Sequence, residues 1–452
     1  MAVYTVRRGK DLKIAGAPSP QELKVDDPPV LGVKPVDFLG IKPKLLIREN
    51  DRVVTGQPLF YAKGHEKLMF CSPGCGIVTA IRRGARRVIT EIEVTRSGAE
   101  DSETFRVFRE SELANISVEE LSAHLMHGGM WPYIRQRPFG KIANPSISPA
   151  VIFINGMDTE PLAADPCILM DGREEDFRMG VRVLQEFTHG PIYLTLPLKT
   201  TGDPPFAQVA GVTVHHFTGP HPSGLVGTHI RHIRPLKPAE IAWTLRAVHV
   251  ADIGSFIRTG KYPVHRTVAI SGTGVAETGY VHTRLGVPVS ALIEHRVKDE
   301  WVRYISGTVL TGSQVEKTGY LGFYDNTLTV IPESEKRDFM GWAMPGWRKY
   351  SLLKAYASCV NPSKTYHLDT RINGGVRAIV NIGAWERVFA LDVHISYLIR
   401  AILAEDLEEA CDLGLLEVTE EDVALCTFAC PSKMELGEII RKGLDLYEKE
   451  NL

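Results

Sequence analysis

Cysteine is sparse in this sequence, and its spacing excludes one class of proteins. Seven cysteines in 452 residues show no disulfide-framework spacing, so we expect folding in a reducing compartment. Runs of about 18 apolar residues are absent, which argues against a membrane-spanning helix. Residues 1–8 lack the apolar core of a secretory signal. The formal net charge of −2 gives no reason to expect a nucleic-acid partner.

Two further cysteines are missing from a pattern near the C-terminus. The run CTFACP at residues 426–431 matches the end of C-x2-C-x2-C-x3-C-P, in which thiolates hold an iron–sulfur cluster. The two earlier ligand positions are Glu420 and Val423, which do not restore the site. We therefore predict that Cys426 and Cys430 are core residues, with redox or metal use as the alternative.

The first part of the chain, residues 1–105, predicts a domain of short strands. Two halves with similar turn and apolar patterns resemble the barrel-sandwich fold of biotinyl and lipoyl domains. In those carriers a lysine sits in the hairpin between the halves. Lys63 and Lys67 occupy this region, but both carrier signatures are missing. A scaffold is the expected role, and a lipoyl or biotin carrier is the alternative.

The remaining sequence predicts an α/β and α+β multidomain protein. Residues 106–258 alternate apolar strands with helical patterns, which indicates a Rossmann-like parallel α/β domain. We expect a β-grasp (SLBB-like) unit over 259–332 and a mixed connecting region over 333–390. Residues 391–452 show helical periodicity, and Leu398, Ile402 and Leu407 are spaced for one helix face.

Together these blocks resemble the NqrA family, the A subunits of the sodium-translocating NADH:quinone reductase, and the resemblance spans essentially the whole chain. The order and spacing of its short motifs are specific, although each motif alone is weak. The motifs are RPF (137–139), MDTEPL (157–162), GLVGTH (224–229), RYISGTVL (303–310), GYLG (319–322), RAIVNIG (377–383), WERV (385–388) and LCTFACP (425–431).

This family is similar to two cofactor-bearing proteins, the C subunit of the Rnf complex and the flavin subunit of respiratory complex I. Their flavin loop, G-R-G-G-A-G-F-P-T, corresponds here to LMHGGMWPY at 125–133. Gly128 and Pro132 match, whereas Gly129, Met130 and Trp131 differ. Glycine lets the backbone approach phosphate oxygens closely, so Met130 and Trp131 are expected to fill that space.

A second flavin-related motif, N-A-D-E-S-E-P-G, corresponds to residues 155–162 at a predicted strand end. Open α/β sheets usually bind ligands at such ends. Asn155, Glu160 and Pro161 match, but Met157 replaces an acid and Leu162 replaces the final glycine. The first cluster motif of the Rnf relative also lacks its ligands here, at Ala378, Asn381, Ala384 and Val388.

The resemblance implies a peripheral, cofactor-free subunit on the cytoplasmic face of the bacterial inner membrane, soluble when isolated. Flavins and the iron–sulfur cluster are expected in partner subunits of the sodium-pumping complex. The membrane subunit beside the quinone site is the main expected partner. The alternative is an autonomous flavin-dependent NADH dehydrogenase that uses the same α/β pocket.

We identify no catalytic residue and no metal site in the sequence. Four side chains near the flavin-like loop have types suited to an apolar slot with a few polar groups, and we predict them as quinone contacts. They are His127, Trp131, Tyr133 and Arg135. A basic hairpin tip is expected to be solvated, and its alternative partner is an anionic lipid or another subunit. It contains Arg82, Arg83, Arg86 and Arg87.

Overall fold

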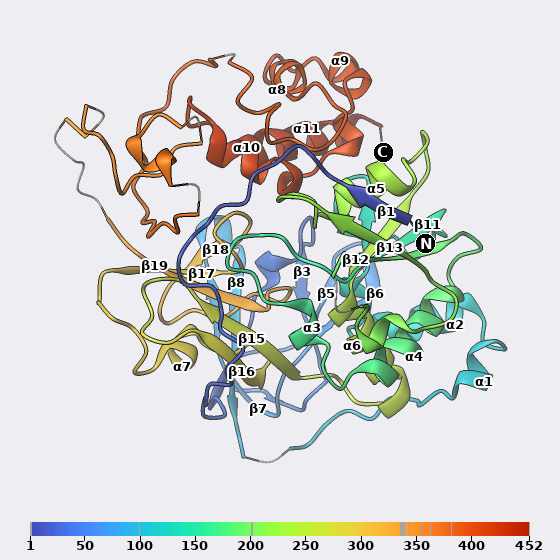
Figure 1. Cartoon of the computed structure of the whole chain (residues 1–452). Helices are drawn as coiled ribbons and strands as arrows, with labels where there is room; N and C mark the ends of the chain where they lie inside the picture. The colour runs from blue at the N-terminus through green and yellow to red at the C-terminus, as the bar shows by residue number, and fades with distance from the viewer. Residues whose placement is uncertain are drawn as a thin grey trace.

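The computed structural model describes residues 2–98, 100–199, 202–334, 340–341, 343–352, 354–361, 363–380 and 382–451. These residues form four sheets, of seven, five, four and three strands, and a group of C-terminal helices (Figure 1). The predicted fold class is confirmed, because the barrel-sandwich, α/β, β-grasp and helical parts are all present. None of the described helices is long and apolar enough to cross a membrane.

The seven-stranded sheet has the order β1-β13-β12-β11-β14-β9-β10. Its centre is parallel, as predicted: β11 (Val151–Asn155) pairs with β12 (Ile192–Pro197) and β14 (Ala242–Arg246). Ile152 and Ile154 face one core while Val151 and Phe153 face another, so both sides of β11 are buried. Its outer strands are β13 (Thr213–Thr218), β9 (Arg135–Arg137) and β10 (Lys141–Ile142).

Helices cover both faces of this sheet. On one face, α4 (Glu174–Gln185) packs closely on α6 (Ala247–Thr259), because Gly254 has no side chain. A Cβ at this position would lie only 1.8 Å from the Asp176 carbonyl oxygen. On the other face lies α5 (Val226–Ile233). The predicted helix after Ser117 is α2 (Val118–His127), and the Ser117 hydroxyl accepts a hydrogen bond from the Glu120 N–H. Two short helices are α1 (Glu110–Leu113) and α3 (Pro166–Leu169).

The N-terminal domain contains two small sheets, β2-β8-β7-β4 and β3-β5-β6. Phe60 and Phe70 stack between neighbouring strands with ring centroids 4.5 Å apart and anchor its core. The strands are β2 (Val30–Val33), β3 (Pro43–Leu45), β4 (Arg52–Val53), β5 (Pro58–Ala62), β6 (His65–Cys71), β7 (Gly76–Arg83) and β8 (Ile89–Arg96).

The first strand of the chain is an exception to this domain. The expected domain over residues 1–105 includes this strand, but β1 (Ala2–Thr5) pairs in parallel with β13 at the edge of the α/β sheet. The following residues then contact the other domains, since Leu12 belongs to the helical core and Leu23 to the β-grasp core. Local patterns cannot reveal such long-range pairing.

The β-grasp unit has the order β16-β15-β19-β17-β18. Its central pair, β15 (His265–Ser271) and β19 (Thr327–Pro332), is parallel, and the neighbouring pairs are antiparallel. The other elements are β16 (Gly279–Arg284), α7 (Val289–Ile293), β17 (Val302–Ser306) and β18 (Ser313–Val315). Short 3-10 helices elsewhere are η1 (Pro35–Asp37), η2 (Ala85–Arg87), η4 (Pro205–Ala207) and η6 (Leu415–Glu417).

The C-terminal domain contains α8 (Ile395–Leu403), α9 (Leu407–Asp412), α10 (Ala424–Ala429) and α11 (Leu436–Asn451). Leu398 and Ile402 are buried on one face of α8, as predicted. The prediction that Leu407 shares this face is wrong. Glu405 has a φ of +60°, which ends α8, and Leu407 starts the next helix.

Candidate functional site

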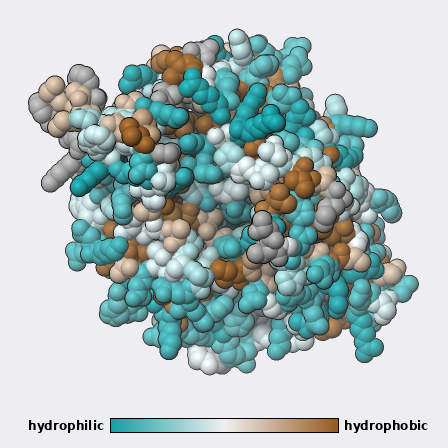
Figure 2. Space-filling view, in the orientation of Figure 1, coloured by the Kyte–Doolittle hydropathy of each residue, from teal (hydrophilic) through white to brown (hydrophobic). Residues whose placement is uncertain are grey.

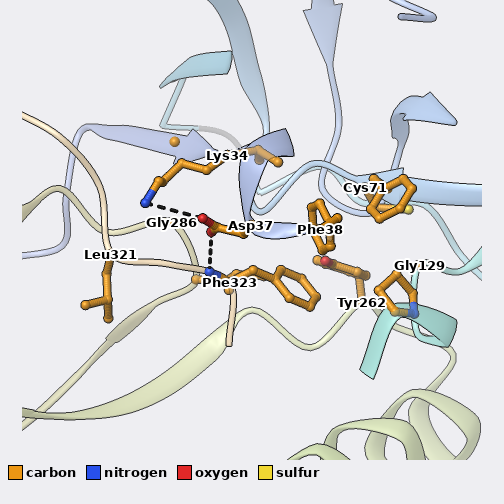
Figure 3. A pocket seen from close by; sticks show the side chains of 14 residues that line it. Lys34, Asp37, Phe38, Cys71, Gly129, Tyr262, Gly286, Leu321 and Phe323 are labelled. Carbon is orange, nitrogen blue, oxygen red and sulfur yellow. Dashed lines mark hydrogen bonds and ion pairs between the residues drawn. The ribbon is translucent and has the colours of Figure 1, made fainter. Parts of the chain in front are cut away.

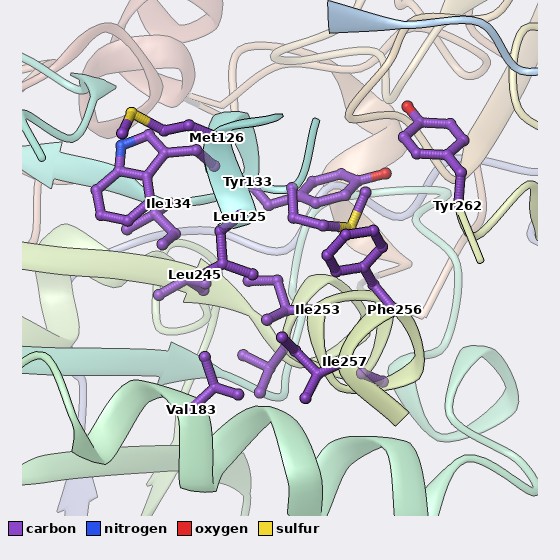
Figure 4. Close-up of a cluster of buried hydrophobic side chains, with 14 of the residues drawn as sticks. Leu125, Met126, Tyr133, Ile134, Val183, Leu245, Ile253, Phe256, Ile257 and Tyr262 are labelled. Atoms are coloured by element: carbon purple, nitrogen blue, oxygen red, sulfur yellow. The ribbon is translucent and has the colours of Figure 1, made fainter. Parts of the chain in front are cut away.

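The flavin-like loop links the end of α2 to the 3-10 helix η3 (Trp131–Tyr133). A Cβ at Gly128 would lie 2.1 Å from Phe256 Cζ, and Gly129, with a φ of +68°, would place a Cβ 2.9 Å from Cys71 Sγ. Figure 4 shows Phe256 of α6 among the buried side chains of this region, which include Leu125. These glycines therefore allow close protein packing at the positions where the relatives cradle phosphate.

The two large residues that follow also occupy the interior. Met130 and Trp131 are both 0% exposed. The Trp131 indole N–H donates to the Ala143 carbonyl over 2.7 Å, and its ring meets Trp243 edge-on at 5.4 Å. The geometry of this loop does not fit a flavin phosphate, because side chains of the protein fill the space beside its backbone.

Tyr133 lies at the centre of a buried aromatic and cationic cluster. Its ring stacks between His249 and Phe323, at centroid distances of 4.6 and 4.7 Å. Its hydroxyl accepts a hydrogen bond from Arg266 Nη2 over 2.9 Å. Burial raises the pKa of Tyr133, although Arg266 opposes the shift. Burial, and then the positive charge of Arg266, lowers the pKa of His249.

The four predicted quinone contacts do not form one group. Arg135 joins the Tyr133 cluster indirectly, since its guanidinium lies 5.6 Å from the Tyr324 ring centroid and Tyr324 contacts Phe323. Trp131 belongs to the separate cluster with Trp243. His127 is exposed at the end of α2. Whether any of these side chains touches a quinone stays a prediction.

Beside this loop lies a narrow slot between the N-terminal domain and the β-grasp unit (Figure 3). Phe38, Phe70, Phe323 and Tyr262 line it, and Lys34 and Asp37 form an ion pair of 3.3 Å at one end. Its volume of about 20 Å³ is enough for one water molecule. The slot has the apolar walls and few polar groups that suit a neutral ring compound, but a ring would enter only if the walls moved.

Asn155 and Glu160 hold the strand-end loop through side-chain hydrogen bonds to other parts of the chain. The Asn155 side-chain amide donates to the Gly224 carbonyl over 2.8 Å. A Glu160 carboxylate oxygen accepts a hydrogen bond from Thr311 over 2.7 Å and another from Thr308, both in the β-grasp unit. Burial, together with nearby Asp158, raises the pKa of Glu160 to about 7. Glu160 thus connects the α/β domain to the β-grasp unit, whereas Asn155 fixes the loop within the α/β domain.

This loop also explains one of the substitutions in the motif. Leu162 has a φ of +67°, the left-handed region that favours glycine. Leu162 therefore keeps the backbone conformation expected of the glycine it replaces, while its side chain is buried. A cavity of about 30 Å³ beside Asn155 and Asp158 remains at the strand ends.

A cavity of about 550 Å³ lies between the α/β domain and the β15–β16 hairpin. Its lining is rich in hydroxyl and charged side chains, and Arg173 and Arg266 both pair with Asp252, at 2.7 and 3.7 Å. No sequence pattern predicts this cleft, because its walls come from remote segments that lie between Thr55 and Asn326 in the chain.

The cysteine pair near the C-terminus lies in the helical core, as predicted. Cys426 and Cys430 are each 0% exposed. The described residues contain no group of three His, Cys, Asp or Glu side chains placed to hold a metal ion. Ala384 and Val388, at the first cluster motif, are also buried, whereas Asn381 lies outside the described residues.

Ion pairs occupy the positions next to the missing cluster ligands. In η7 (Glu420–Val423), Glu421 and Asp422 bind the Arg137 guanidinium at 2.5 and 2.9 Å. Arg137 comes from β9, so this network joins the α/β sheet to the helical domain. Arg137 lies in the RPF motif, but the motif predicts no role for it, because its two partners are 284 and 285 residues away.

Three family models match the chain in order. They are the NqrA N-terminal barrel-sandwich hybrid domain over residues 4–97, the NqrA second alpha/beta domain over 116–262, and the NQRA C-terminal domain over 267–317.

Curated proteins named as the A subunit of Na(+)-translocating NADH-quinone reductase are similar over the full length. The protein of Hahella chejuensis is 38% identical, with 98% of this chain and 99% of that protein covered. The protein of Pasteurella multocida is 37% identical, with 99% and 100% covered. The protein of Neisseria meningitidis serogroup B is 37% identical, with 98% and 99% covered.

Proposed function

The chain belongs to the NqrA family, the A subunits of the Na(+)-translocating NADH-quinone reductases, and from this premise we propose that it is one subunit of such a complex. The observation that carries the proposal is the relationship to these subunits across 98% of the chain. The assembled complex would couple NADH oxidation and quinone reduction to Na⁺ transport. This chain would sit peripherally at the cytoplasmic face of the membrane, bound to the other subunits.

In this proposal the chain holds no flavin and no iron–sulfur cluster. The support is steric for the flavin, since Phe256, Met130 and Trp131 fill the space around the flavin-like loop. For the cluster the support is chemical, because Glu420 and Val423 replace two thiolate ligands and both remaining cysteines are buried. Electron carriers would then belong to the partner subunits, and the chain would act in assembly.

A share in quinone access is the second part of the proposal. The slot beside Gly129 is lined by aromatic side chains, and Tyr262 supplies a hydroxyl next to them. Through Phe323 this slot adjoins the cluster that contains Tyr133 and Arg135. Quinone would enter after the N-terminal domain and the β-grasp unit separate slightly, and Tyr262 would donate a hydrogen bond to a quinone carbonyl.

The first experiment tests the cofactor assignment on the purified full chain. We expect a colourless protein, near-zero iron and acid-labile sulfide, and no change in melting temperature with micromolar flavin mononucleotide. A flavin at a hundredfold excess over its Kd would stabilise the chain by about 2.7 kcal/mol. A yellow protein that oxidises NADH alone would instead establish the autonomous dehydrogenase.

The second experiment tests the function in the assembled complex. Deleting this chain should abolish Na⁺-dependent NADH:quinone turnover, and restoring it should recover the activity. For quinone access, Tyr262→Phe should raise the KM for quinone several-fold without changing electron transfer from NADH to an artificial acceptor. Tyr397→Phe is the control, because Tyr397 is 56% exposed and far from the aromatic slot in sequence. An unchanged KM would remove quinone access from the proposal.

A further inference from the structure

Exposed apolar side chains concentrate in one stretch of the chain, residues 340–382, which we call the connecting segment. Among described residues, eight of the twenty exposed large apolar side chains lie there, in under a tenth of the chain's length. The most exposed are Val376 at 84% and Val360 at 78%, and Trp347 is 64% exposed. The others are Met340, Met344, Ile372, Val380 and Ile382. Such clustering marks an interaction surface.

The charged side chains of the connecting segment are mostly basic. The segment contains six lysines and arginines and a single acid, Asp369, although the whole chain has a net charge of −2. Asp369 pairs within the segment, at 2.8 Å from Arg371. Arg348 and Arg377 are exposed beside Trp347 and Val376, respectively. A partner would therefore need apolar groups and an excess of carboxylates.

The segment is attached to the body of the protein at several points. Tyr366 forms an isolated bridge with Ile14, and Tyr350 contacts Phe428 of α10 at a centroid distance of 5.7 Å. The Val380 N–H donates to the Ser432 hydroxyl over 3.2 Å. It projects at the upper left of Figure 1 beside the C-terminal helices, and in Figure 2 that region shows brown groups among teal ones. The surface is thus presented on the helical domain.

Backbone structure distinguishes a protein partner from a lipid surface. The described residues of the segment form one 3-10 helix, η5 (Ala357–Val360), and the isolated bridge, and otherwise lie outside helices and strands. Irregular backbone does not enter the hydrocarbon region of a membrane, because its polar groups would lose their hydrogen bonds. A protein partner leaves the polar groups of such backbone within reach of water and of the partner's own hydrogen-bonding groups. Exposed Met, Trp and Arg side chains are also typical of protein interfaces.

We infer that the connecting segment is the docking surface for another subunit of the complex, through a stretch of that subunit with aliphatic side chains and excess carboxylates. This inference rests on the proposed function. It explains why the described residues of this stretch, which have little regular structure, carry so much exposed apolar surface: the surface is buried on assembly.

The experiment co-expresses the tagged full chain with the remaining subunits and purifies it from detergent-solubilised membranes. Ile372→Glu/Val376→Glu should reduce the co-purified subunits at least tenfold, and Arg348→Glu/Arg377→Glu should reduce them in a salt-dependent manner. Leu46→Glu/Leu198→Glu is the matched control, since these side chains are 50% and 51% exposed elsewhere. Arg83→Glu/Arg86→Glu tests whether the basic hairpin tip also contributes to binding of the other subunits; we expect this variant to co-purify with them as the wild type does. All variants should melt as the isolated wild-type chain does.

The outcomes separate the two proposals. If the wild-type chain co-purifies with no other subunits, the proposed function fails. If it co-purifies and the segment variants do so equally well, the docking surface is wrong while the function stands. The isolated chain is also sedimented with protein-free vesicles of 7:3 phosphatidylcholine and phosphatidylglycerol. If the wild-type chain sediments with the vesicles and the segment variants do not, the surface binds lipid and the inference is overturned. Slower amide exchange over 340–382 in the complex than in the isolated chain would support it.

Discussion

Removing the Arg137 side chain should loosen the helical domain from the α/β sheet. The Arg137 side chain is 4% exposed, and its partners Asp422 and Glu421 are 2% and 36% exposed. Truncating one member of a buried ion pair leaves an uncompensated charge and costs 3–5 kcal/mol. Because Glu421 is partly solvated, we expect Arg137→Met to cost about 3 kcal/mol, the lower end of that range.

The measurement must resolve one domain, since a chain of several domains does not unfold in two states. Amide hydrogen exchange of α8 and α11 reports the local free energy of opening. A loss of about 3 kcal/mol should speed exchange by a factor of roughly 150. Exchange in the β-grasp strands should stay unchanged, because the ion pairs of Arg137 join β9 to η7 and leave the β-grasp sheet intact.

A double variant separates the lost ion pair from lost packing. In Arg137→Met/Asp422→Asn no charge remains buried at the pair, and the amide oxygen can still accept the hydrogen bond that the Thr419 N–H donates to Asp422, so much of the stability should return. Arg82→Met is the surface control, because Arg82 is 59% exposed beside Glu93 and should show no measurable change. The reasoning is refuted if exchange in Arg137→Met changes less than threefold, or if the double variant is as unstable as the single one.

Buried groups lead to three further predictions. Replacing Cys426 and Cys430 with alanine should cost about 1 kcal/mol each but leave the turnover of the assembled complex unchanged; lost turnover with normal assembly would contradict the packing role. Because the pKa of Glu160 in the folded protein is about 7, above its usual value of 4.5, folding takes up a proton between these values, so this group's destabilising effect grows as pH rises from 4.5 through 7. Glu160→Gln should flatten that dependence in melting curves, and an unchanged slope would refute the assignment. Gly128→Ala should lower the melting temperature, since its Cβ would lie 2.1 Å from Phe256, and adding Phe256→Leu should restore part of the loss; equal melting of the variant and the wild type would show that the helix shifts freely.

Much of the candidate site could be read from the sequence at the level of motifs. The prediction that Cys426 and Cys430 are core residues is confirmed, and Met130 and Trp131 are buried as well. The quinone-contact prediction for Trp131 relied on side-chain type and could not include its burial against Trp243. Burial depends on the surface that a distant strand supplies, and no local pattern contains that information.

The sequence by itself determined the family, the types of the elements and the missing cluster ligands, because motif spacing and hydrophobic periodicity act over short stretches. Tertiary structure alone decided that β1 joins the sheet of another domain and that Arg137 binds carboxylates 284 and 285 residues away. It also decided that Gly128 and Gly129 allow close packing of this loop against Phe256 of α6 and Cys71 of the N-terminal domain. The physical reason is that each of these contacts needs two surfaces from remote parts of the chain, and only the folded protein brings them together.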